Sequence, residues 1–305
     1  MTEEKKTIME VKNLTKIFTS GIINKTQTVG AKDVSFKVKE GEILSLIGES
    51  GSGKTTIGKM ILKLLDPTDG QIIYRDQDIT TLESKEQKKK YYRFVQGVFQ
   101  DPFSSFNSLF KVRRIFDMVF RNFMPDAENK EEKILNALDQ VNLTADHLDK
   151  FPHQLSGGQL QRMLIARALL LDVDILIADE LISMLDASTR MGILNLLIDI
   201  CRDTGMSIIF ITHDLNLGYY VSDYTLILRK GRLVERGLTK KIYENPVHPY
   251  TEMLFESVPD IHEIWDRDEK FLPEQIDDYV DKFYQRQEGS GFKAVEEDHH
   301  VLFSE

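Results

Sequence analysis

The sequence predicts an α/β fold with an open, mainly parallel sheet. Residues 43–47, 175–178 and 207–211 are largely apolar runs, as strands are when a parallel sheet is covered on both faces. Stretches with apolar residues at helical spacing alternate with these runs, which is the order of a doubly wound sheet. Glycine or polar residues follow each run, and such folds bind ligands at the carboxyl ends of their strands. We therefore expect the functional site at that edge.

Length and composition narrow the class of protein. The 305 residues suffice for one large or two modest domains, and a formal net charge of −10 argues against a general nucleic-acid binder. The chain has a single cysteine, Cys201, which excludes an internal disulfide or a cysteine-ligated metal cluster. Cys201 shares the apolar face of a predicted helix, so we expect it in the core. The polar start and the lack of a ~20-residue apolar stretch predict neither a signal segment nor a membrane span. The expected compartment is a reducing cytosol.

The N-terminal part reads as an antiparallel β edge. Residues 8–18 and 32–38 alternate between apolar and polar, as half-buried strands do, and residues 20–28 form a polar, turn-rich connection. Residues 71–74 predict a further strand. Residues 84–92 predict a charged helix whose run of three lysines, 88–90, favours a solvated helix face over a surface for nucleic acid or lipid.

A glycine-rich segment joins the first buried strand to a helix. It reads Gly48-Glu49-Ser50-Gly51-Ser52-Gly53-Lys54-Thr55 and fits the phosphate-loop pattern G-x-x-x-x-G-K-[ST]. Its glycines allow consecutive N–H groups to turn inward around an anion, Lys54 adds positive charge, and the Thr55 hydroxyl can hold Mg²⁺. The residues that follow carry a helical apolar stripe: Ile57, Met60, Ile61 and Leu64. Because strand, loop and helix occur in the required order, a phosphate site is favoured over a glycine-rich surface turn.

The middle of the chain changes character. Residues 94–99 predict a strand that stops at Gln100-Asp101-Pro102. Residues of about 103–165 then show helical stripes, such as Ile134, Leu138 and Val141, and predict a helical subdomain inserted into the sheet. This subdomain closes on Leu155-Ser156-Gly157-Gly158-Gln159, where Ser156 is the expected N-cap of the next helix.

Two carboxylates and a histidine follow the last buried strands. Asp179-Glu180 ends the run 175–178, and Thr212-His213-Asp214 ends the run 207–211, with a helix expected at 187–202 between them. Residues 224–229 and 232–235 predict a closing hairpin, and short helices are expected around Lys240 and Thr251. The remainder predicts an acidic tail, in which His299-His300 could bind metal but a mobile segment is favoured.

These motifs in this order resemble the ATP-binding subunits of ATP-binding cassette transporters, over nearly the whole chain. Gly48 to Thr55 matches the Walker A motif of that family, and residues 175–179 match its Walker B motif. Gln100 matches the Q-loop and residues 155–159 match the signature peptide. Residues 183–186 match the D-loop, and His213 matches the switch histidine. The resemblance implies a phosphate-loop NTPase core of the RecA-like type over residues 1–238 and a C-terminal extension over 239–305. Residues 98–107 and 245–251 are similar to the subfamily of importers for oligopeptides, dipeptides and nickel. That subfamily also imports oligosaccharides, so the solute stays open.

The resemblance also implies roles for single residues. ATP is contacted by the loop residues Gly48, Glu49, Ser50, Gly51, Ser52, Gly53, Lys54, Thr55 and Thr56. Thr55 and Asp179 hold Mg²⁺, while Gln100 senses that ion or the attacking water. Glu180 polarises the water and His213 contacts the γ-phosphate. Phe18 either stacks on adenine or belongs to the core.

The signature peptide implies a partner. In the family, Ser156, Gly157, Gly158 and Gln159, together with Asp186, close the ATP bound by a second subunit in a head-to-tail sandwich. We therefore expect a heterodimer with a second ATP-binding subunit on the cytoplasmic face of the cell membrane, beneath two transmembrane permease subunits. Residues 100–114 pass motion to these subunits, and an extracytoplasmic solute-binding protein serves the complex.

Two departures from the family pattern leave alternatives open. Leu181 stands where proline is common after the catalytic glutamate, and Leu160 stands where arginine is usual after the signature glutamine. One alternative is therefore a regulatory subunit that binds ATP without hydrolysing it. Another is a soluble cassette ATPase of DNA repair or translation, although a second cassette and a long coiled coil are both missing from the sequence.

Overall fold

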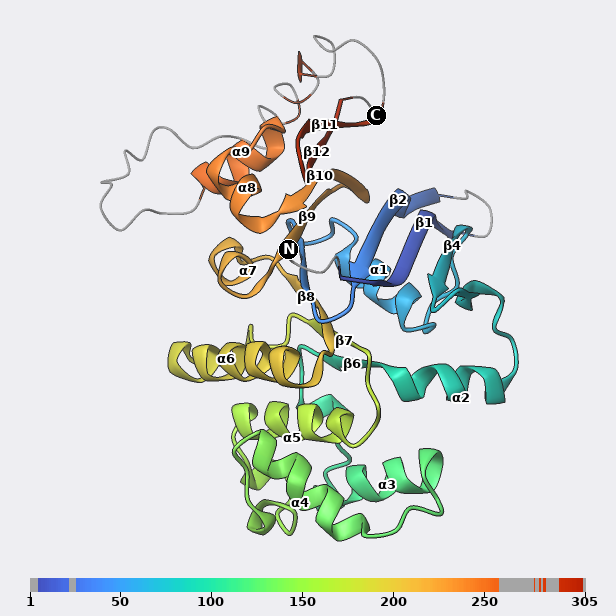
Figure 1. Cartoon of the computed structure of the whole chain (residues 1–305), viewed down its shortest axis with the longest axis vertical. Coiled ribbons are helices and arrows are strands. Elements are labelled where there is room, and N and C mark those ends of the chain that lie inside the picture. Colours follow the sequence, from blue (N-terminus) through green and yellow to red (C-terminus); the bar gives the residue numbers. More distant parts are fainter. Residues whose placement is uncertain are drawn as a thin grey trace.

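The computed structural model describes residues 5–21, 26–257, 277, 280, 282–283 and 291–303. Within them the chain forms a central sheet, a smaller antiparallel sheet and a layer of helices (Figure 1). The antiparallel sheet and the α1 end of the molecule lie on one side of the central strands. The helices α3 (Arg114–Phe123), α4 (Lys130–Gln140) and α5 (Gly157–Leu169) lie together at the lower end of the view in Figure 1.

The central sheet has the strand order β11-β12-β10-β9-β3-β8-β7-β6 within the described residues. From β9 to β6 all neighbours are parallel, as predicted, and every residue of β3, β7 and β8 is buried. The bounds are β3 Ile43–Ile47, β6 Val95–Phe99, β7 Ile175–Asp179, β8 Ser207–Thr212, β9 Tyr224–Arg229, β10 Arg232–Leu238, β11 Phe292–Glu296 and β12 His299–Leu302. Helices α6 (Ala187–Thr204) and α7 (Leu215–Val221) follow β7 and β8, and α7 was not predicted.

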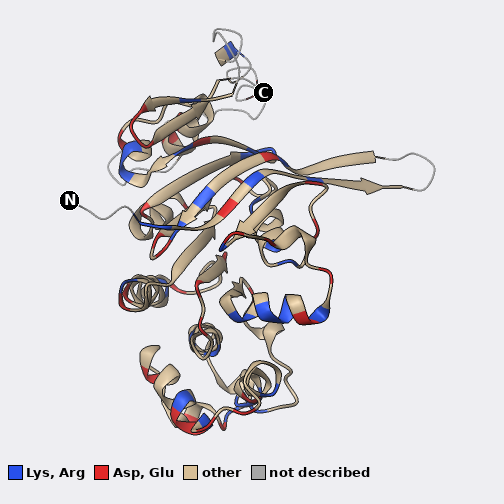
Figure 2. Cartoon of the chain, turned by 45° about the vertical axis from the view of Figure 1, so that its right-hand side comes forward, with Lys and Arg blue, Asp and Glu red and all other residues tan. Residues whose placement is uncertain are grey.

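The N-terminal strands form a separate sheet with the order β2-β1-β4-β5. Its bounds are β1 Thr7–Ser20, β2 Thr26–Lys39, β4 Asp69–Tyr74 and β5 Gln77–Asp78. The predicted loop at 20–28 is shorter than expected, because β1 and β2 stay paired as far as Ser20 and Thr26, while residues 22–25 lie outside the described residues. This hairpin extends beyond the body of the molecule (Figure 2). One apolar cluster joins this sheet to α1 (Lys54–Ile61) and to the central strands.

Helix α1 is shorter than its apolar stripe predicts. Its last residue is Ile61, and Lys63 takes a left-handed φ of 52° directly afterwards. Leu64 therefore leaves the stripe and is 59% exposed, contrary to the prediction. The next helix, α2 (Lys85–Phe94), begins at a reciprocal capping box between Ser84 and Gln87 and carries its lysines on the outside (Figure 2).

The middle of the chain is helical, as predicted. Its elements are η2 Phe103–Ser105, α3 Arg114–Phe123, α4 Lys130–Gln140, η3 Ala145–His147, η4 Pro152–Gln154 and α5 Gly157–Leu169. The expected stripe of Ile134, Leu138 and Val141 is buried against α5 in a continuous core. Cys201 belongs to the same core, and burial raises the pKa of its thiol to about 11.

The C-terminal part holds α8 (Thr239–Glu244) and α9 (Pro249–Glu256), the two short helices that were predicted. The expectation of a mobile tail is wrong for residues 291–303, because β11 and β12 form a hairpin that pairs with β10. His299 is fully buried and its Nε2 lies 2.6 Å from a Glu235 carboxylate oxygen. Across the described part of the chain, no group of three or more His, Cys, Asp or Glu residues is arranged to hold a metal. No helix in that part is both long and apolar enough to cross a membrane.

Candidate functional site

The phosphate loop lies between β3 and α1, at the carboxyl edge of the central sheet. Gly51 and Gly53 have φ of 82° and 103°, which side chains strongly disfavour. The loop is also tightly enclosed, since a Cβ on Gly48 would lie 2.2 Å from the Leu228 carbonyl oxygen and one on Gly53 would lie 2.2 Å from the Gly30 carbonyl oxygen. Close backbone contacts therefore require glycine at Gly48 and Gly53, and the left-handed φ favours glycine at Gly51 and Gly53.

Lys54 is buried inside the loop. Its Nζ donates hydrogen bonds to the Gly48 carbonyl oxygen at 2.7 Å and to the Glu49 carbonyl oxygen at 2.8 Å. Burial lowers the pKa of Lys54, while the nearby carboxylates of Glu180 and Asp179 act in the opposite direction. The site thus concentrates a cation and two carboxylates at one point, which is the charge pattern expected around a bound phosphate and its metal ion.

The end of β7 faces the start of α1. The Thr55 hydroxyl donates a hydrogen bond to Asp179 Oδ1 at 3.1 Å, although 124 residues separate the two in sequence. Burial raises the pKa of Asp179, and the Thr55 hydrogen bond partly opposes this shift. The pair presents a hydroxyl and a carboxylate oxygen, which are hard ligands of the kind that Mg²⁺ prefers. The residues present therefore fit the expected metal ion.

Glu180 and His213 form a second pair at the same edge. His213 Nδ1 lies 3.2 Å from Glu180 Oε1. Glu180 has a left-handed φ of 49°, an uncommon conformation for a residue with a side chain, and its N–H donates to the Ile211 carbonyl oxygen at 2.9 Å. The pair borders a cavity of about 60 Å³, which is large enough for a water molecule. A carboxylate, an imidazole and room for water are thus brought together beside the phosphate loop.

Gln100 also lies at this edge, directly after the β6 residue that pairs with Asp179. Its backbone is held by Gln161, a fully buried residue that the sequence did not single out. The Gln161 amide donates to the carbonyl oxygens of Leu181 at 2.8 Å and of Phe99 and Gln100 at 3.2 and 3.3 Å. One α5 side chain therefore fastens both the Q-loop and the segment after Glu180. Only its position two residues after the signature glutamine could have drawn attention to it.

The two departures from the family pattern lie in the core. Leu160 and Leu181 are both fully buried, and the Leu181 carbonyl oxygen accepts the Gln161 bond. The Ser183 N–H and hydroxyl both donate to the Glu180 carbonyl oxygen, at 3.1 and 3.0 Å. The backbone after Glu180 is thus held by hydrogen bonds in the absence of a proline.

Phe18 lies near the end of β1 with 40% of its surface exposed, so it is not a core residue. Its ring lies against Gly30, and the Thr56 methyl group borders the same space. The Lys16 ammonium is 5.5 Å from the ring centre. An exposed aromatic face next to the start of α1 is in a suitable place to stack on a base.

The signature residues lie apart from the phosphate loop, in a second cluster. Ser156 caps α5, where its hydroxyl accepts from the Gln159 N–H at 3.2 Å and its own N–H donates to Gln159 Oε1 at 2.9 Å. A Cβ on Gly157 would meet Leu185 at 3.2 Å and one on Gly158 would meet Thr189 at 2.4 Å. Asp186, the exposed N-cap of α6, accepts hydrogen bonds from Ser188 and Thr189, which lower its pKa. The structure therefore brings the signature peptide next to the D-loop.

A phosphate loop with strand-end carboxylates, on a parallel sheet with an inserted helical layer, defines a nucleotide-binding cassette of the P-loop class. Two family models match the sequence. One is described as ABC transporter and matches residues 31–183, and the other as Oligopeptide/dipeptide transporter, C-terminal region, and matches residues 234–286. The chain therefore belongs to the ABC transporter family and is an ATP-binding cassette of it.

Individual relatives agree with this assignment. The chain is 40% identical over 280 residues to the "Oligopeptide transport ATP-binding protein OppF" of Streptococcus pyogenes serotype M1, covering 90% of each chain. It is 40% identical over 227 residues to the "Dipeptide transport ATP-binding protein DppF" of Escherichia coli (strain K12), covering 74% of this chain and 68% of that one. The dimeric, post-hydrolysis structure of the ATP-binding cassette MJ0796 bound to ADP and Pi matches with a TM-score of 0.68 and 27% identity, over 76% of this chain and 98% of that one. The predicted cassette fold is confirmed.

Proposed function

We propose that this chain is the ATP-hydrolysing subunit of an importer for oligopeptides or dipeptides. The observation that carries the proposal is the meeting of the Thr55–Asp179 and Glu180–His213 pairs at the phosphate loop. The peptide class follows from the match to the oligopeptide/dipeptide transporter C-terminal region and from the names of the relatives. These same matches speak against a soluble ATPase of DNA repair or translation. A nickel or oligosaccharide importer remains the alternative solute class.

Transfer of the γ-phosphoryl group to water requires the residues of the site mainly to position the reacting groups and to stabilise charge. Lys54 and the N–H groups of the loop hold the phosphates, and Phe18 stacks on the adenine. Thr55 and Asp179 would hold Mg²⁺, which would supply positive charge to offset that of the phosphates, and Gln100 lies at the adjoining strand end. Glu180 orients and polarises the attacking water, and His213, held by Glu180, contacts the γ-phosphate.

The second cluster supports a paired assembly. Ser156 and Asp186 lie on exposed helix starts, whereas Lys54 and Asp179 are buried around the loop. We infer that Ser156, Gly157, Gly158, Gln159 and Asp186 complete the ATP site of a second subunit, which in this subfamily is usually a different chain. The dimeric cassette structure that matches this chain supports the paired arrangement. Each sandwich would then hold two ATP molecules.

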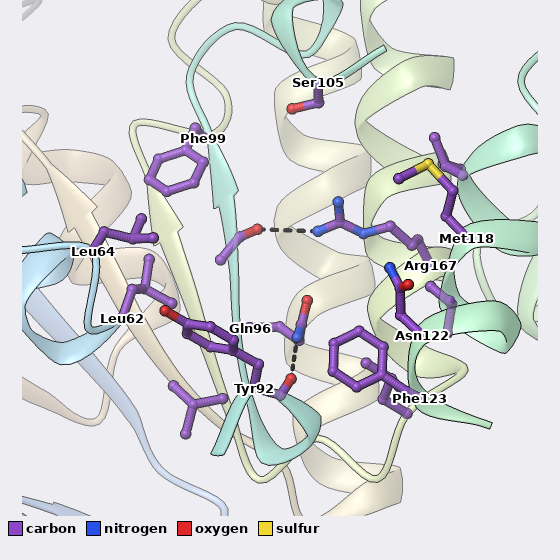
Figure 3. A pocket seen from close by; sticks show the side chains of 15 residues that line it. Leu62, Leu64, Tyr92, Gln96, Phe99, Ser105, Met118, Asn122, Phe123 and Arg167 are labelled. Atoms are coloured by element: carbon purple, nitrogen blue, oxygen red, sulfur yellow. Dashed lines mark hydrogen bonds between the residues drawn. The ribbon is translucent and has the colours of Figure 1, made fainter. Parts of the chain in front are cut away.

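A groove between the helical layer and the core suits the membrane subunits. It has a volume of about 360 Å³ and lies between α2, β6 and α3 (Figure 3). Its lining is mostly apolar and includes the exposed side chains of Leu64 and Met118. Inside it, the Arg167 guanidinium donates to the Gly97 carbonyl oxygen at 3.3 Å. We infer that a helix from a permease subunit docks here on the cytoplasmic face, next to the segment that follows Gln100.

ATP turnover in the assembled transporter tests the proposal. Glu180→Gln removes the carboxylate that polarises water, so we expect the rate to fall by about 10²- to 10⁴-fold while MgATP still binds. We expect His213→Ala to lower the rate strongly as well. Glu244→Gln, the same change at an exposed residue at the end of α8, is the matched control. An unchanged rate in Glu180→Gln would overturn the mechanism.

A variation of this assay separates a catalytic from a regulatory subunit. The rate is measured with the partner subunit's own phosphate loop disabled. A residual rate that Glu180→Gln abolishes assigns hydrolysis to this chain. A complex that shows no residual rate, although this chain binds MgATP, would favour the regulatory alternative.

A further inference from the structure

Helix α9 contacts the back of the phosphate loop. Tyr250, its second residue, is 2% exposed, and its hydroxyl oxygen accepts a hydrogen bond from the Glu49 N–H at 3.2 Å. The two residues are 201 positions apart in sequence. The C-terminal segment, which lies outside the cassette motifs, thus makes a direct hydrogen bond to the loop that binds phosphate.

The sequence His248-Pro249-Tyr250 is what places this hydroxyl. His248 caps α9, since its Nδ1 accepts from the Tyr250 N–H at 3.1 Å, and Pro249 occupies the first turn. Burial lowers the pKa of His248 to about 3, so the imidazole is neutral and its Nδ1 can act as an acceptor. The His248 N–H itself donates to the Glu235 carboxylate of β10 at 3.1 Å. Each residue of the motif therefore has a defined structural task.

The Tyr250 ring is held on several sides. It belongs to an apolar cluster with Ile47, the last residue before the loop, and with Ile227 and Ile242. The Arg229 guanidinium lies 5.7 Å from the ring centre, within the range of a cation–π contact. Burial also raises the pKa of the Tyr250 phenol, which therefore remains neutral. The hydroxyl cannot move away from Glu49 without disturbing this packing.

Glu49 lies between an inner and an outer contact. On the inner side its carbonyl oxygen accepts from Lys54 Nζ at 2.8 Å, and on the outer side its N–H donates to Tyr250. Farther along the loop, the Ser52 carbonyl oxygen accepts from the Gly231 N–H at 2.9 Å. Residues 228–250 thus support the outer face of the loop at several points. A loop that is fixed beforehand binds phosphate more tightly, because less conformational freedom is lost on binding.

We propose that Tyr250 is a positioning residue for the ATP site, through which the C-terminal segment holds the phosphate loop in its binding conformation. The proposal rests on the proposed function only in taking ATP as the ligand. Tyr250 acts through Glu49 and does not touch the nucleotide. Loss of its hydroxyl should therefore weaken MgATP binding without changing the chemistry of a bound molecule.

The test compares two Tyr→Phe variants of the full chain. Tyr250→Phe leaves the Glu49 N–H without its acceptor, so we expect the Kd for MgATP to rise about threefold to tenfold. Tyr243→Phe is the matched control, because Tyr243 is a tyrosine of the same segment whose hydroxyl donates to the Leu215 carbonyl oxygen at 2.6 Å, away from the loop. We expect its Kd to stay within about twofold of wild type. In the assembled transporter, Tyr250→Phe should raise KM for ATP and leave kcat unchanged.

Amide hydrogen exchange measures the hydrogen bond between the Glu49 N–H and the Tyr250 hydroxyl directly. The Glu49 N–H should be protected in the wild-type chain and exchange faster in Tyr250→Phe, but not in Tyr243→Phe. An unchanged Kd together with unchanged Glu49 exchange in Tyr250→Phe would overturn the proposal, as would a fall in kcat with an unaltered KM. If the wild-type chain bound no MgATP, the proposed function would fail, while rapid Glu49 exchange in that same chain would overturn the contact itself.

Discussion

The phosphate loop and the signature peptide are both glycine-rich helix starts, but they are held in different ways. Segments remote in sequence enclose the loop. The carbonyl oxygens of Leu228 and Gly30 lie close to its glycines, and Tyr250 and Asp179 accept hydrogen bonds from Glu49 and Thr55 at its two ends. The signature peptide is held by the local bonds between Ser156 and Gln159 and by packing on the start of α6. The loop is therefore enclosed by segments of its own chain, whereas the signature peptide is held locally and leaves Ser156 exposed, which fits its proposed role at the ATP of another chain.

An enclosed phosphate loop should not tolerate a side chain at its glycines. Gly53→Ala places a Cβ 2.2 Å from the Gly30 carbonyl oxygen at a φ of 103°, so two backbones must move apart. We expect the free energy of unfolding to fall by about 3 kcal/mol or more, with loss of MgATP binding. Urea denaturation and nucleotide titration measure the two effects.

The matched change in the other region is Gly157→Ala. There the new Cβ would meet only the end of the Leu185 side chain, at 3.2 Å, on a residue that is already helical. We expect its stability to stay within about 1 kcal/mol of wild type. Equal urea midpoints for Gly53→Ala and the wild type would contradict the enclosed-loop description.

The support behind the loop should weaken in acid. The pKa of His248 falls from its ordinary 6.5 to about 3 in the folded chain, so below pH 6.5 the unfolded chain binds a proton that the folded chain resists. The stabilisation is complete above pH 6.5, and it declines by about 1.4 kcal/mol per pH unit as the pH falls towards 3. We expect the wild type to lose about 2 kcal/mol more between pH 6.5 and pH 5 than His248→Asn, which keeps a capping side chain.

Urea denaturation of both proteins at the two pH values measures this difference. The neighbouring Glu235 and His299 are present in both chains, so their own titration is shared by the two proteins. If the two proteins lost the same stability on acidification, the buried neutral state of His248 would be refuted.

The elements that the sequence predicted are those defined by local pattern. The run Ile43–Ile47 and the glycines after it carry strand and loop in consecutive residues, and β3 begins and ends as expected. Helix α7 was missed because its seven residues include Gly218 and three polar or aromatic positions that blur the apolar period. The early end of α1 was missed because a lysine stands at position 63, where a left-handed residue that ends a helix is usually glycine or asparagine.

The candidate site shows the same division. The phosphate loop was predicted from its spacing and the other motif residues from the resemblance to the family, yet the contacts that hold these residues involve positions whose local pattern does not indicate such contacts. Gln161 looks like an ordinary polar position of a helix, and the segment 245–251, which includes Tyr250, indicated the subfamily but not a contact with the loop. The hairpin of β11 and β12 depends on pairing with β10, more than 60 residues earlier, so its acidic sequence alone suggested a tail. Long-range contacts of this kind are not encoded in a local pattern.

The smallest effect on the isolated chain is expected at Ser156. Ser156→Ala removes an N-cap, so the chain should lose about 1 kcal/mol of stability. Ser84→Ala is a matched control, because Ser84 caps α2 through the same reciprocal bonds to Gln87. Both variants should bind MgATP as single chains like the wild type, because neither residue belongs to the loop cluster.

The assembled transporter should distinguish these two serines. In the proposed paired assembly the Ser156 hydroxyl would face the ATP of the second subunit, so its loss should lower the turnover rate, while Ser84→Ala should leave the rate unchanged. The turnover rates of the two complexes are measured, together with MgATP titrations of the two single chains. These measurements check the expected turnover rates and the expected unchanged binding. If Ser156→Ala weakened MgATP binding by the single chain, the signature peptide would belong to this chain's own site, and the separation of the two regions would be wrong.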